Sequence, residues 1–150
     1  MSTAFDRDVL AKTDTQALVS TRRTVKFQEV DAAGTIYFPR VLEYFADAYL
    51  LVLERAGLDV PAMLRDKTLA APLAHAEADF LRPLFFGDVV DVEVLALQVG
   101  KTSATFGHRI RDAKGRAAAV GRTVHVFIDP RTFQPTAVPP GLAALANVTA

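Results

Sequence analysis

Residues 26–57 read KFQEVDAAGTIYFPRVLEYFADAYLLVLERAG, and they decide the fold of this 150-residue chain. A short alternating run leads into a tight acidic turn at Gly34, and a long apolar segment follows from Pro39. Proline is favoured in the first turn of a helix, and Gly57 suits the left-handed residue just past a helix end. The stretch therefore predicts a helix from about Pro39 to Gly57. Its apolar residues lie on nearly every side, which predicts a buried helix.

The start of this helix also has chemical meaning. The first backbone N–H groups of a helix lack partners and carry the positive end of the helix dipole, so they hold a carboxylate or a developing oxyanion. Asp31 lies just upstream, in the turn. From local physics alone two interpretations stay open: Asp31 takes part in catalysis beside these donors, or it is an ordinary turn or capping residue.

The rest of the chain is dominated by strand patterns. Alternating apolar and polar residues, bounded by turn residues, predict five strands. They are expected at residues 21–28, 68–81, 89–99, 102–111 and 117–128. In the third of these strands the apolar face consists of Val90, Val92, Val94 and Ala96, and Asp91 and Glu93 point away from it.

A long helix followed by antiparallel strands predicts the α+β class, with a curved antiparallel sheet of about five strands wrapped around one long buried helix. The length suits a single domain over residues 1–150. Residues 1–20 show weak periodicity and are expected to form a loose arm or a short helix. Residues 129–150 are expected to form a proline-rich tail that ends in a short helix.

Composition excludes several classes of function. The 17 Lys and Arg residues balance 17 Asp and Glu residues, so no basic field attracts nucleic acid or an anionic membrane. The chain has no cysteine and therefore no disulfide or thiolate metal site. Its first twenty residues lack the apolar region of a secretory signal, and no stretch approaches the roughly 20 apolar residues of a membrane span. We expect a cytoplasmic protein with no nucleic-acid or membrane partner.

Histidines are the natural place to look for a metal site or a catalytic base. If Arg111 pairs with Arg116 in the last hairpin, His108 and His125 are six residues out of register, which separates them by roughly 20 Å. No cluster of side chains matches a known ligand motif. Neither a glycine-rich phosphate loop nor a Gly-x-Ser-x-Gly elbow is present. No metal and no cofactor are expected.

Two blocks of the sequence point to a family. The first is FQEVDAAGTIYFP, residues 27–39, where an aromatic residue precedes Asp31, two small residues, a glycine and two aromatic residues. The second is ADFLRP, residues 78–83, followed by Gly87 and Asp88. Together they resemble the hotdog-fold thioesterases of the 4-hydroxybenzoyl-CoA thioesterase type, and the similarity runs over residues 21–128. The chain is also similar to the 1,4-dihydroxy-2-naphthoyl-CoA thioesterases, which likewise hydrolyse aromatic acyl groups.

The resemblance implies a hotdog fold, an acyl-CoA substrate and hydrolysis to the free acid and coenzyme A. It implies a homo-oligomer, either a dimer with a continuous sheet or a dimer of dimers (a homotetramer). Two alternatives stay open. One is a hydrolase or binding module for acyl carrier protein or polyketide thioesters. The other is a hotdog dehydratase, which the absence of any histidine before residue 74 disfavours.

The resemblance also assigns catalytic roles. Asp31 would be the nucleophile or the general base, and the backbone N–H of Phe38 would polarise the thioester oxygen. Some bacterial members carry a histidine where Phe38 stands, so a mechanism that needs this histidine is not expected. Other relatives place the acid on the long helix, where Glu43 and Asp47 are the alternatives. With Arg40 these two have a plain interpretation as an ion-paired stripe.

For coenzyme A the resemblance points to Lys101, Thr102 and Ser103, with Arg82 and Arg109 as weaker candidates. A lysine meets a phosphate as a point charge, and hydroxyl groups add hydrogen bonds. For the acyl group, an aromatic pocket and an ordinary core are both open interpretations of the helix aromatics. The residues concerned are Tyr37, Phe38, Phe45 and Tyr49.

Overall fold

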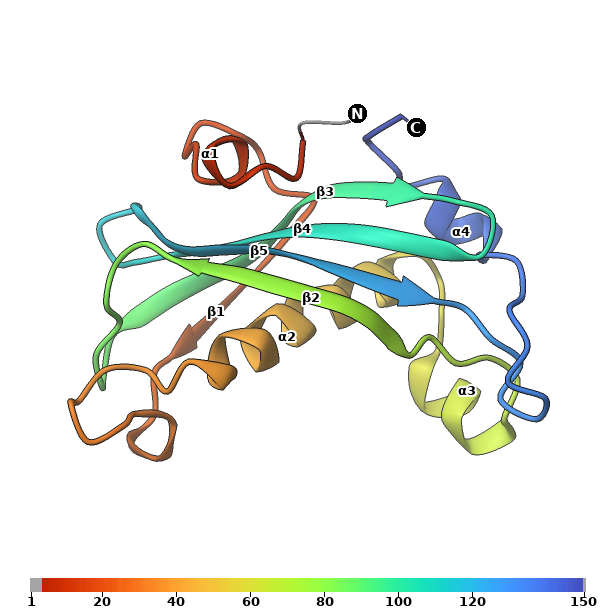
Figure 1. The fold of residues 1–150 in the computed structure, drawn as a ribbon, viewed down its shortest axis with the longest axis horizontal. Helices are drawn as coiled ribbons and strands as arrows, with labels where there is room; N and C mark the ends of the chain where they lie inside the picture. Colours follow the sequence, from red (N-terminus) through yellow and green to blue (C-terminus); the bar gives the residue numbers. More distant parts are fainter. Residues whose placement is uncertain (1–3, 150) are drawn as a thin grey trace.

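A five-stranded antiparallel sheet curves around one long helix, α2, in the computed structural model, which describes residues 4–149 (Figure 1). The strand order is β1-β3-β4-β5-β2, so β1 and β2 are the edges. No helix within the described residues is long and apolar enough to cross a membrane. The elements are α1 (Arg7–Leu10), β1 (Val19–Thr24), the 3-10 turn η1 (Phe27–Glu29), α2 (Pro39–Arg55), α3 (Val60–Asp66), β2 (Leu73–Phe80), β3 (Val89–Val99), β4 (Ser103–Arg111), β5 (Ala117–Val126) and α4 (Pro140–Ala143).

Helix α2 begins at Pro39, and Gly57, at a φ of +85°, follows its end, so the predicted helix is confirmed. One face of α2 packs on the concave side of the sheet. This face carries Val41, Tyr44, Phe45, Ala48, Tyr49, Val52 and Leu53. The opposite face exposes Leu42 and Leu50. The expectation of burial nearly all round is therefore wrong for a single chain, because the sheet covers only one side of the helix.

Strand β3 follows the predicted bounds but not the predicted alternation. Val90, Val92 and Val94 belong to the core beside α2, as expected. The pairing with β4 then shifts between Val94 and Ala96, which marks a β-bulge. Leu97 takes the place on the core side that was predicted for Ala96.

The convex side of the sheet is covered by the N-terminal segment. Leu10 of α1 is buried in a second cluster with Leu95, Ala117 and Val120. The guanidinium of Arg109 donates hydrogen bonds to the backbone carbonyls of Lys12 and Thr15. Of the two forms predicted for residues 1–20, the described part shows the short helix, followed by a packed segment rather than a loose arm, and residues 1–3 lie outside the described residues. Its anchors are distant in the sequence, so no local pattern revealed them.

The hairpin of β4 and β5 forms as predicted, with a different register. Ile110 pairs with Ala119, and Arg111 pairs with Ala117 rather than with Arg116. The backbone N–H of Asp112 donates to the carbonyl of Arg116 and closes the turn. This one-residue difference at Arg111, together with the further register shift between Ile110 and Arg111, leaves the two histidines of the hairpin four residues out of register instead of six.

His108 and His125 both pack around Phe106, at ring-centroid distances of 6.4 and 5.6 Å. The predicted separation of roughly 20 Å is therefore too large.

The C-terminal tail packs on the fold at two places. Leu142 of α4 is fully buried in the main core, and the predicted short helix is confirmed. Farther along, the side-chain amide of Asn147 donates to the carbonyl of Leu95 and accepts the N–H of Leu97. These two backbone groups belong to the bulged part of β3, beyond the last residue that pairs with β1. The tail thus replaces β1 along this end of β3.

Candidate active site

Asp31 lies at the tip of a loop that is closed at its base by a bridge between Val30 and Ile36. The N–H of Asp31 donates to the carbonyl of Thr35 at 2.9 Å, and the N–H of Gly34 donates to the carbonyl of Asp31 at 3.0 Å. Gly34 has a φ of +83°, which only glycine adopts at low cost. We call residues 31–35 the Asp31 loop. Its tip is exposed to solvent, so the carboxylate is accessible.

One oxygen of the Asp31 carboxylate has a local task. It accepts the N–H of Ala33 at 2.8 Å, which is the bond of an Asx turn. This is the turn-forming role considered from the sequence. The bond fixes the direction of the carboxylate and leaves the second oxygen without a hydrogen-bond partner among the described residues. Turn formation and chemistry are therefore compatible in the same side chain.

The base of the loop is held by the connection between β2 and β3. Val30 and Ile36 are partly buried against the main core. The N–H of Ile36 donates to the carbonyl of Leu84 at 2.7 Å, and Thr35 forms a bridge with Phe85. The residues directly after the second sequence block thus support the loop formed by the first.

The backbone N–H of Phe38 is free at the start of α2. Within residues 4–149 it has no hydrogen-bond acceptor, and the residue that follows is proline. The neighbouring N–H of Tyr37 is already used, because it donates to the carbonyl of Glu29 at 2.8 Å. The first turn of a helix carries the positive end of the dipole. Phe38 therefore presents a donor of the kind that stabilises an oxyanion.

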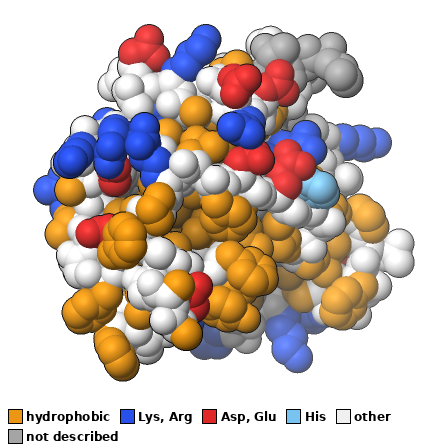
Figure 2. Space-filling view, turned by 60° about the vertical axis from the view of Figure 1, so that its left-hand side comes forward, with side chains coloured by type: hydrophobic (Ala, Val, Ile, Leu, Met, Phe, Trp, Pro, Cys, Tyr) orange, Lys and Arg blue, Asp and Glu red, His pale blue; other side chains and the backbone are white. Residues whose placement is uncertain are grey.

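Exposed aromatic side chains surround the loop and form what we call the aromatic patch, which consists of Phe27, Tyr37, Phe38, Phe85 and Phe86. Tyr37 and Phe38 meet edge to face at 5.3 Å, and Phe27 and Phe86 do so at 5.9 Å. Figure 2 shows hydrophobic side chains gathered on the lower part of this end of the molecule. Exposed apolar patches mark binding surfaces.

Sequence reasoning missed three members of the aromatic patch. The alternating pattern placed Phe27 in a strand, and Phe85 and Phe86 received no functional interpretation, although two adjacent phenylalanines before Gly87 were a visible signal. Conversely, Phe45 and Tyr49 face the sheet and are 0% and 9% exposed. The pocket interpretation is therefore wrong for these two residues, which belong to the core.

The alternative acids on α2 are engaged in ion pairs. Glu43 pairs with Arg40 at 3.0 Å, and Asp47 pairs with Arg23 of β1. Both carboxylates lie on the exposed face of the helix rather than at its start. The ion-paired stripe considered from the sequence describes them, although Asp47 takes its partner from β1.

The residues predicted to bind coenzyme A do not meet Asp31 within one chain. Lys101 and Thr102 form the turn between β3 and β4, and Ser103 opens β4. The Asp31 loop lies at the other end of β3, beside α2's start (Figure 1). The 11 residues of β3 span roughly 35 Å at about 3.3 Å per residue.

The two arginine candidates separate clearly. Arg82 is exposed in the connection that supports the Asp31 loop, so it lies at the same end of the sheet as Asp31. Arg109 is 1% exposed and pairs with Glu93 at 2.7 Å on the convex side. The proposal of Arg109 as a coenzyme A ligand is therefore wrong, because its charge is already neutralised inside the protein.

The histidines of the hairpin belong to the core. The His108 ring stacks on Phe45 at 4.6 Å, and the His125 ring stacks on Tyr49 at 3.9 Å. Burial lowers the pKa of His108 to about 3 and lowers that of His125 as well. Among the described residues no group of three or more histidine, aspartate or glutamate side chains is placed to hold a metal ion.

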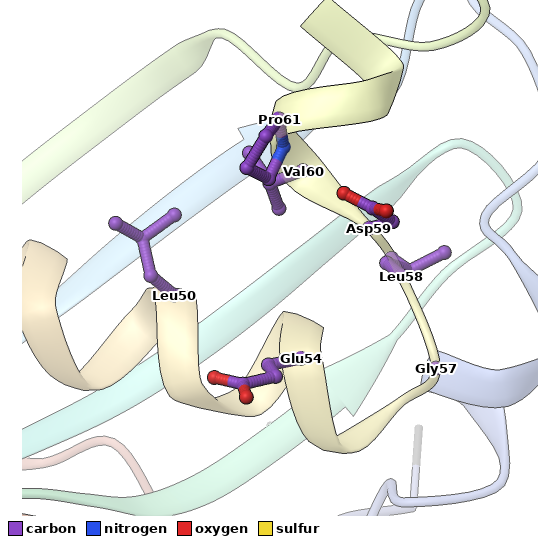
Figure 3. A pocket seen from close by; sticks show the side chains of 7 residues that line it. All are labelled: Leu50, Glu54, Gly57, Leu58, Asp59, Val60 and Pro61. Carbon is purple, nitrogen blue, oxygen red and sulfur yellow. The ribbon is translucent and has the colours of Figure 1, made fainter.

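A sizeable hollow lies elsewhere, at the far end of α2. It is an open groove of about 640 Å³ between α2 and α3, lined by Leu50, Glu54, Gly57, Leu58, Asp59, Val60 and Pro61 (Figure 3). Its only titratable side chains are the carboxylates of Glu54 and Asp59, which project from opposite walls. Because this groove lies at the end of α2 opposite Asp31, it is not the site at which Asp31 would act. The accessible Asp31 loop therefore remains the candidate active site.

Comparison with known proteins shows the family of the chain. Residues 25–145 match the family model described as the thioesterase-like superfamily. The chain belongs to the thioesterase-like superfamily. The matched residues include the whole Asp31 loop, α2 and all of the sheet except β1.

Other members of the thioesterase-like superfamily define the likeness further. A 1,4-dihydroxy-2-naphthoyl-CoA hydrolase from Rippkaea orientalis is 34% identical over 116 residues, which are 76% of this chain and 84% of the relative. The protein of that name from Picosynechococcus sp. is 35% identical over 124 residues, 79% of this chain and 85% of the relative.

Solved structures confirm the predicted hotdog fold. A 1,4-dihydroxy-2-naphthoyl-CoA thioesterase from Synechocystis superposes with a TM-score of 0.77 at 24% identity, over 84% of this chain and 93% of its own. A gentisyl-coenzyme A thioesterase gives a TM-score of 0.75 at 23% identity, over 83% and 99%. At these identities the solved structures establish the fold alone.

Proposed function

We propose that this protein hydrolyses the thioester of an aromatic acyl-CoA, such as 1,4-dihydroxy-2-naphthoyl-CoA or 4-hydroxybenzoyl-CoA, to the free acid and coenzyme A. The observation that carries the proposal is the accessible Asp31 carboxylate and the free N–H of Phe38, on one short segment within the aromatic patch. The names of the relatives at 34% and 35% identity support the same chemistry.

Asp31 offers two routes to the same products. As a nucleophile, its free oxygen attacks the thioester carbonyl and expels the coenzyme A thiolate, which leaves a mixed anhydride for water to hydrolyse. As a general base, it takes a proton from water while the water oxygen attacks the carbonyl, and the tetrahedral intermediate then expels the coenzyme A thiolate, which takes up a proton. In both routes negative charge develops on the carbonyl oxygen, and the Phe38 N–H stabilises that charge. Tyr37 and the other aromatic residues pack on the acyl group.

Residues from two copies of the chain would bind each coenzyme A. Arg82 lies at the Asp31 end, while Lys101, Thr102 and Ser103 lie at the far end of β3. Two copies arranged side by side in opposite directions would bring the Lys101 turn of one to the Asp31 loop of the other. We therefore include a homodimer, or a dimer of dimers, in the proposal.

The test is thiol release from a panel of aromatic and aliphatic acyl-CoA thioesters, with matched acyl carrier protein thioesters alongside. We expect the highest kcat/KM with aromatic acyl-CoA. Preference for the carrier-protein thioesters would favour the alternative hydrolase. A protein that binds the thioesters without releasing thiol would be a binding module, and hydration or dehydration without thiol release would indicate the dehydratase.

Asp31→Asn separates chemistry from turn formation. Asparagine keeps the size and accepts the Ala33 N–H, so the loop should fold as before. We expect kcat to fall by at least about 100-fold, with KM little changed, because the lost interaction belongs to the transition state.

The matched control is Asp112→Asn, in which another aspartate accepts N–H groups at an exposed turn. Its kcat should stay at the wild-type value. A folded Asp31→Asn protein with nearly wild-type hydrolysis would refute the assignment and direct attention to Glu43 and Asp47.

A further inference from the structure

Glu29 lies two residues before Asp31, and its charged side chain is buried. Only 4% of the residue is exposed. One carboxylate oxygen accepts the hydroxyl of Tyr44 at 2.8 Å and the backbone N–H of Lys26 at 2.9 Å. The other accepts the guanidinium of Arg23 at 2.7 Å. The carboxylate thus ties η1 to both β1 and α2.

The backbone of Glu29 adds a direct link to the site. Its carbonyl accepts the N–H of Tyr37 at 2.8 Å, across the base of the Asp31 loop. The bond holds the peptide between Ile36 and Tyr37, and the next peptide, between Tyr37 and Phe38, carries the Phe38 N–H. Asp31 follows Glu29 in the chain, with only Val30 between them. Glu29 is therefore connected both to Asp31, which carries the carboxylate, and to the segment that carries the Phe38 N–H.

The partners of Glu29 are themselves fixed. The Arg23 guanidinium lies 3.7 Å from the centre of the Tyr44 ring and also pairs with Asp47. Burial alone would raise the pKa of Glu29, but the hydrogen bonds from Lys26 and Tyr44 and the charge of Arg23 outweigh it and lower that pKa. The side chain is thus an anion at neutral pH, and it cannot reach substrate because the residue is enclosed.

The protein contains a second buried carboxylate that serves for comparison. Glu93 is 1% exposed and pairs with Arg109 at 2.7 Å and with Arg111 at 2.9 Å. It lies on the convex side of the sheet, under the N-terminal segment. A buried ion pair that contributes only to stability is therefore available in the same molecule.

We propose that Glu29 is a positioning residue, which holds the Asp31 carboxylate and the Phe38 N–H at their working separation. This inference rests on the proposed function. Positioning is worth much in catalysis, since a displacement of about 1 Å by a change away from the chemistry costs up to about 100-fold in rate. Glu29 acts through the loop and makes no contact with substrate.

Glu29→Gln tests this role. Glutamine keeps the volume and one acceptor but turns an N–H₂ group or a neutral oxygen toward Arg23, so the loop loses its charged anchor. We expect kcat to fall by roughly 10- to 100-fold with KM nearly unchanged, in assays well below the unfolding temperature. Glu93→Gln, the matched control, should lower the unfolding temperature and leave kcat unchanged. Tyr44→Phe, which removes one hydrogen bond and keeps the charge, should lower kcat less and in the same direction.

A double-mutant cycle with Asp31→Asn distinguishes positioning from general destabilisation. If Glu29 acts through Asp31, Glu29→Gln should cause a much smaller loss of kcat in the Asp31→Asn protein than in the wild type. Wild-type kcat in both Glu29→Gln and Tyr44→Phe, or losses that multiply fully with Asp31→Asn, would overturn the positioning role and leave the proposed function standing. Absence of thiol release by the wild type would overturn the proposed function and this role together.

Discussion

His108 is fully buried between α2 and the sheet, where it is hydrogen-bonded to Thr123 at 2.8 Å. Its Nδ1 has no hydrogen-bond partner among the described residues. A protonated ring would place a charge beside Phe45 and Phe106 with no carboxylate in contact, which is why burial lowers its pKa to about 3. The residue is thus a neutral part of the core whose ionisation opposes folding.

The stability of the protein should therefore fall on mild acidification. Unfolded His108 has an ordinary pKa of 6.5, so between about pH 6.5 and 3 the unfolded state binds a proton that the folded state does not. The contribution is complete above pH 6.5 and is lost as the pH decreases. Urea unfolding should give a free energy of unfolding lower by about 1.4 kcal/mol at pH 5.5 than at pH 7.5 from His108 alone.

His125 adds to the effect in the same direction, because burial also lowers its pKa. The variant His108→Gln keeps a polar group near Thr123 and cannot titrate, so it should lose the part of the pH dependence that comes from His108. The same free energy of unfolding at pH 7.5 and 5.5 in the wild type would contradict this account.

At the scale of elements, Gly121 of β5 lies against both β2 and α2 without room for a side chain. A Cβ atom there would overlap the carbonyl of Glu77 on β2 and the ring of Phe45 on α2. Glycine is therefore required by space rather than by backbone conformation. Gly121→Ala should destabilise the protein by about 1–3 kcal/mol, the usual cost of overpacking. Differential scanning calorimetry measures the change.

Gly100→Ala is the control for this prediction. A Cβ at Gly100 would meet its nearest neighbour, the carbonyl of Ser103, at 3.4 Å, and its φ is not in the left-handed region. Its unfolding temperature should stay close to that of the wild type. Equal effects of the two substitutions would show that helix packing does not limit position 121.

Local signals were enough to predict some elements and not others. Proline and glycine gave the bounds of α2, and alternation gave those of β3. The bulge at Leu95 was not predictable, because the tail residue Asn147, some fifty positions away, bonds the backbone there. The packed N-terminal segment was missed for the same reason, since it is held by contacts with distant strands.

The candidate site divides in the same way. The turn signals around Gly34 placed Asp31 and Phe38 correctly on one loop and helix start. The role of Glu29 could not be predicted, because in the sequence it is one more charged residue near the end of an alternating run. Its importance depends on burial and on partners in β1 and α2, which only the folded chain brings together.

At the scale of the whole molecule, the described residues leave apolar surfaces besides the aromatic patch without partners in one chain. The edge strand β2 exposes Leu73 and Phe80, and the outer face of α2 exposes Leu42 and Leu50. Unpaired sheet edges of this kind are usually covered or paired. We expect a homodimer or a dimer of dimers, and light scattering at micromolar concentration should give the mass of at least two chains. A monomeric mass would contradict the shared site.

Complementation tests whether Asp31 and Lys101 act across two copies. Lys101→Ala alone should raise KM for acyl-CoA more than it lowers kcat, because a phosphate contact contributes uniform binding. Mixed with Asp31→Asn under conditions that exchange subunits, each hybrid dimer contains one site with both wild-type residues. Activity with wild-type KM should therefore appear in the mixture, at up to about half the wild-type kcat per hybrid dimer.

The outcome depends on the arrangement of the site. If both residues served the same chain, no hybrid would hold an intact site, and the mixture would show only the raised KM. Lys114→Ala, which changes the exposed lysine of the other hairpin turn, is the control and should leave KM unchanged. A mixture without any component of wild-type KM would refute sharing between subunits.

Both ends of the described chain leave the sheet on the convex side, opposite α2 (Figure 1). These two ends are therefore suitable attachment points. An affinity tag, a fluorescent fusion or a linker to a sensor surface, joined beyond either of these ends, would start on the side of the sheet away from α2. Immobilised protein would present the same face to every ligand injected over it, which makes the chain well suited to surface-based binding measurements and to display on a carrier.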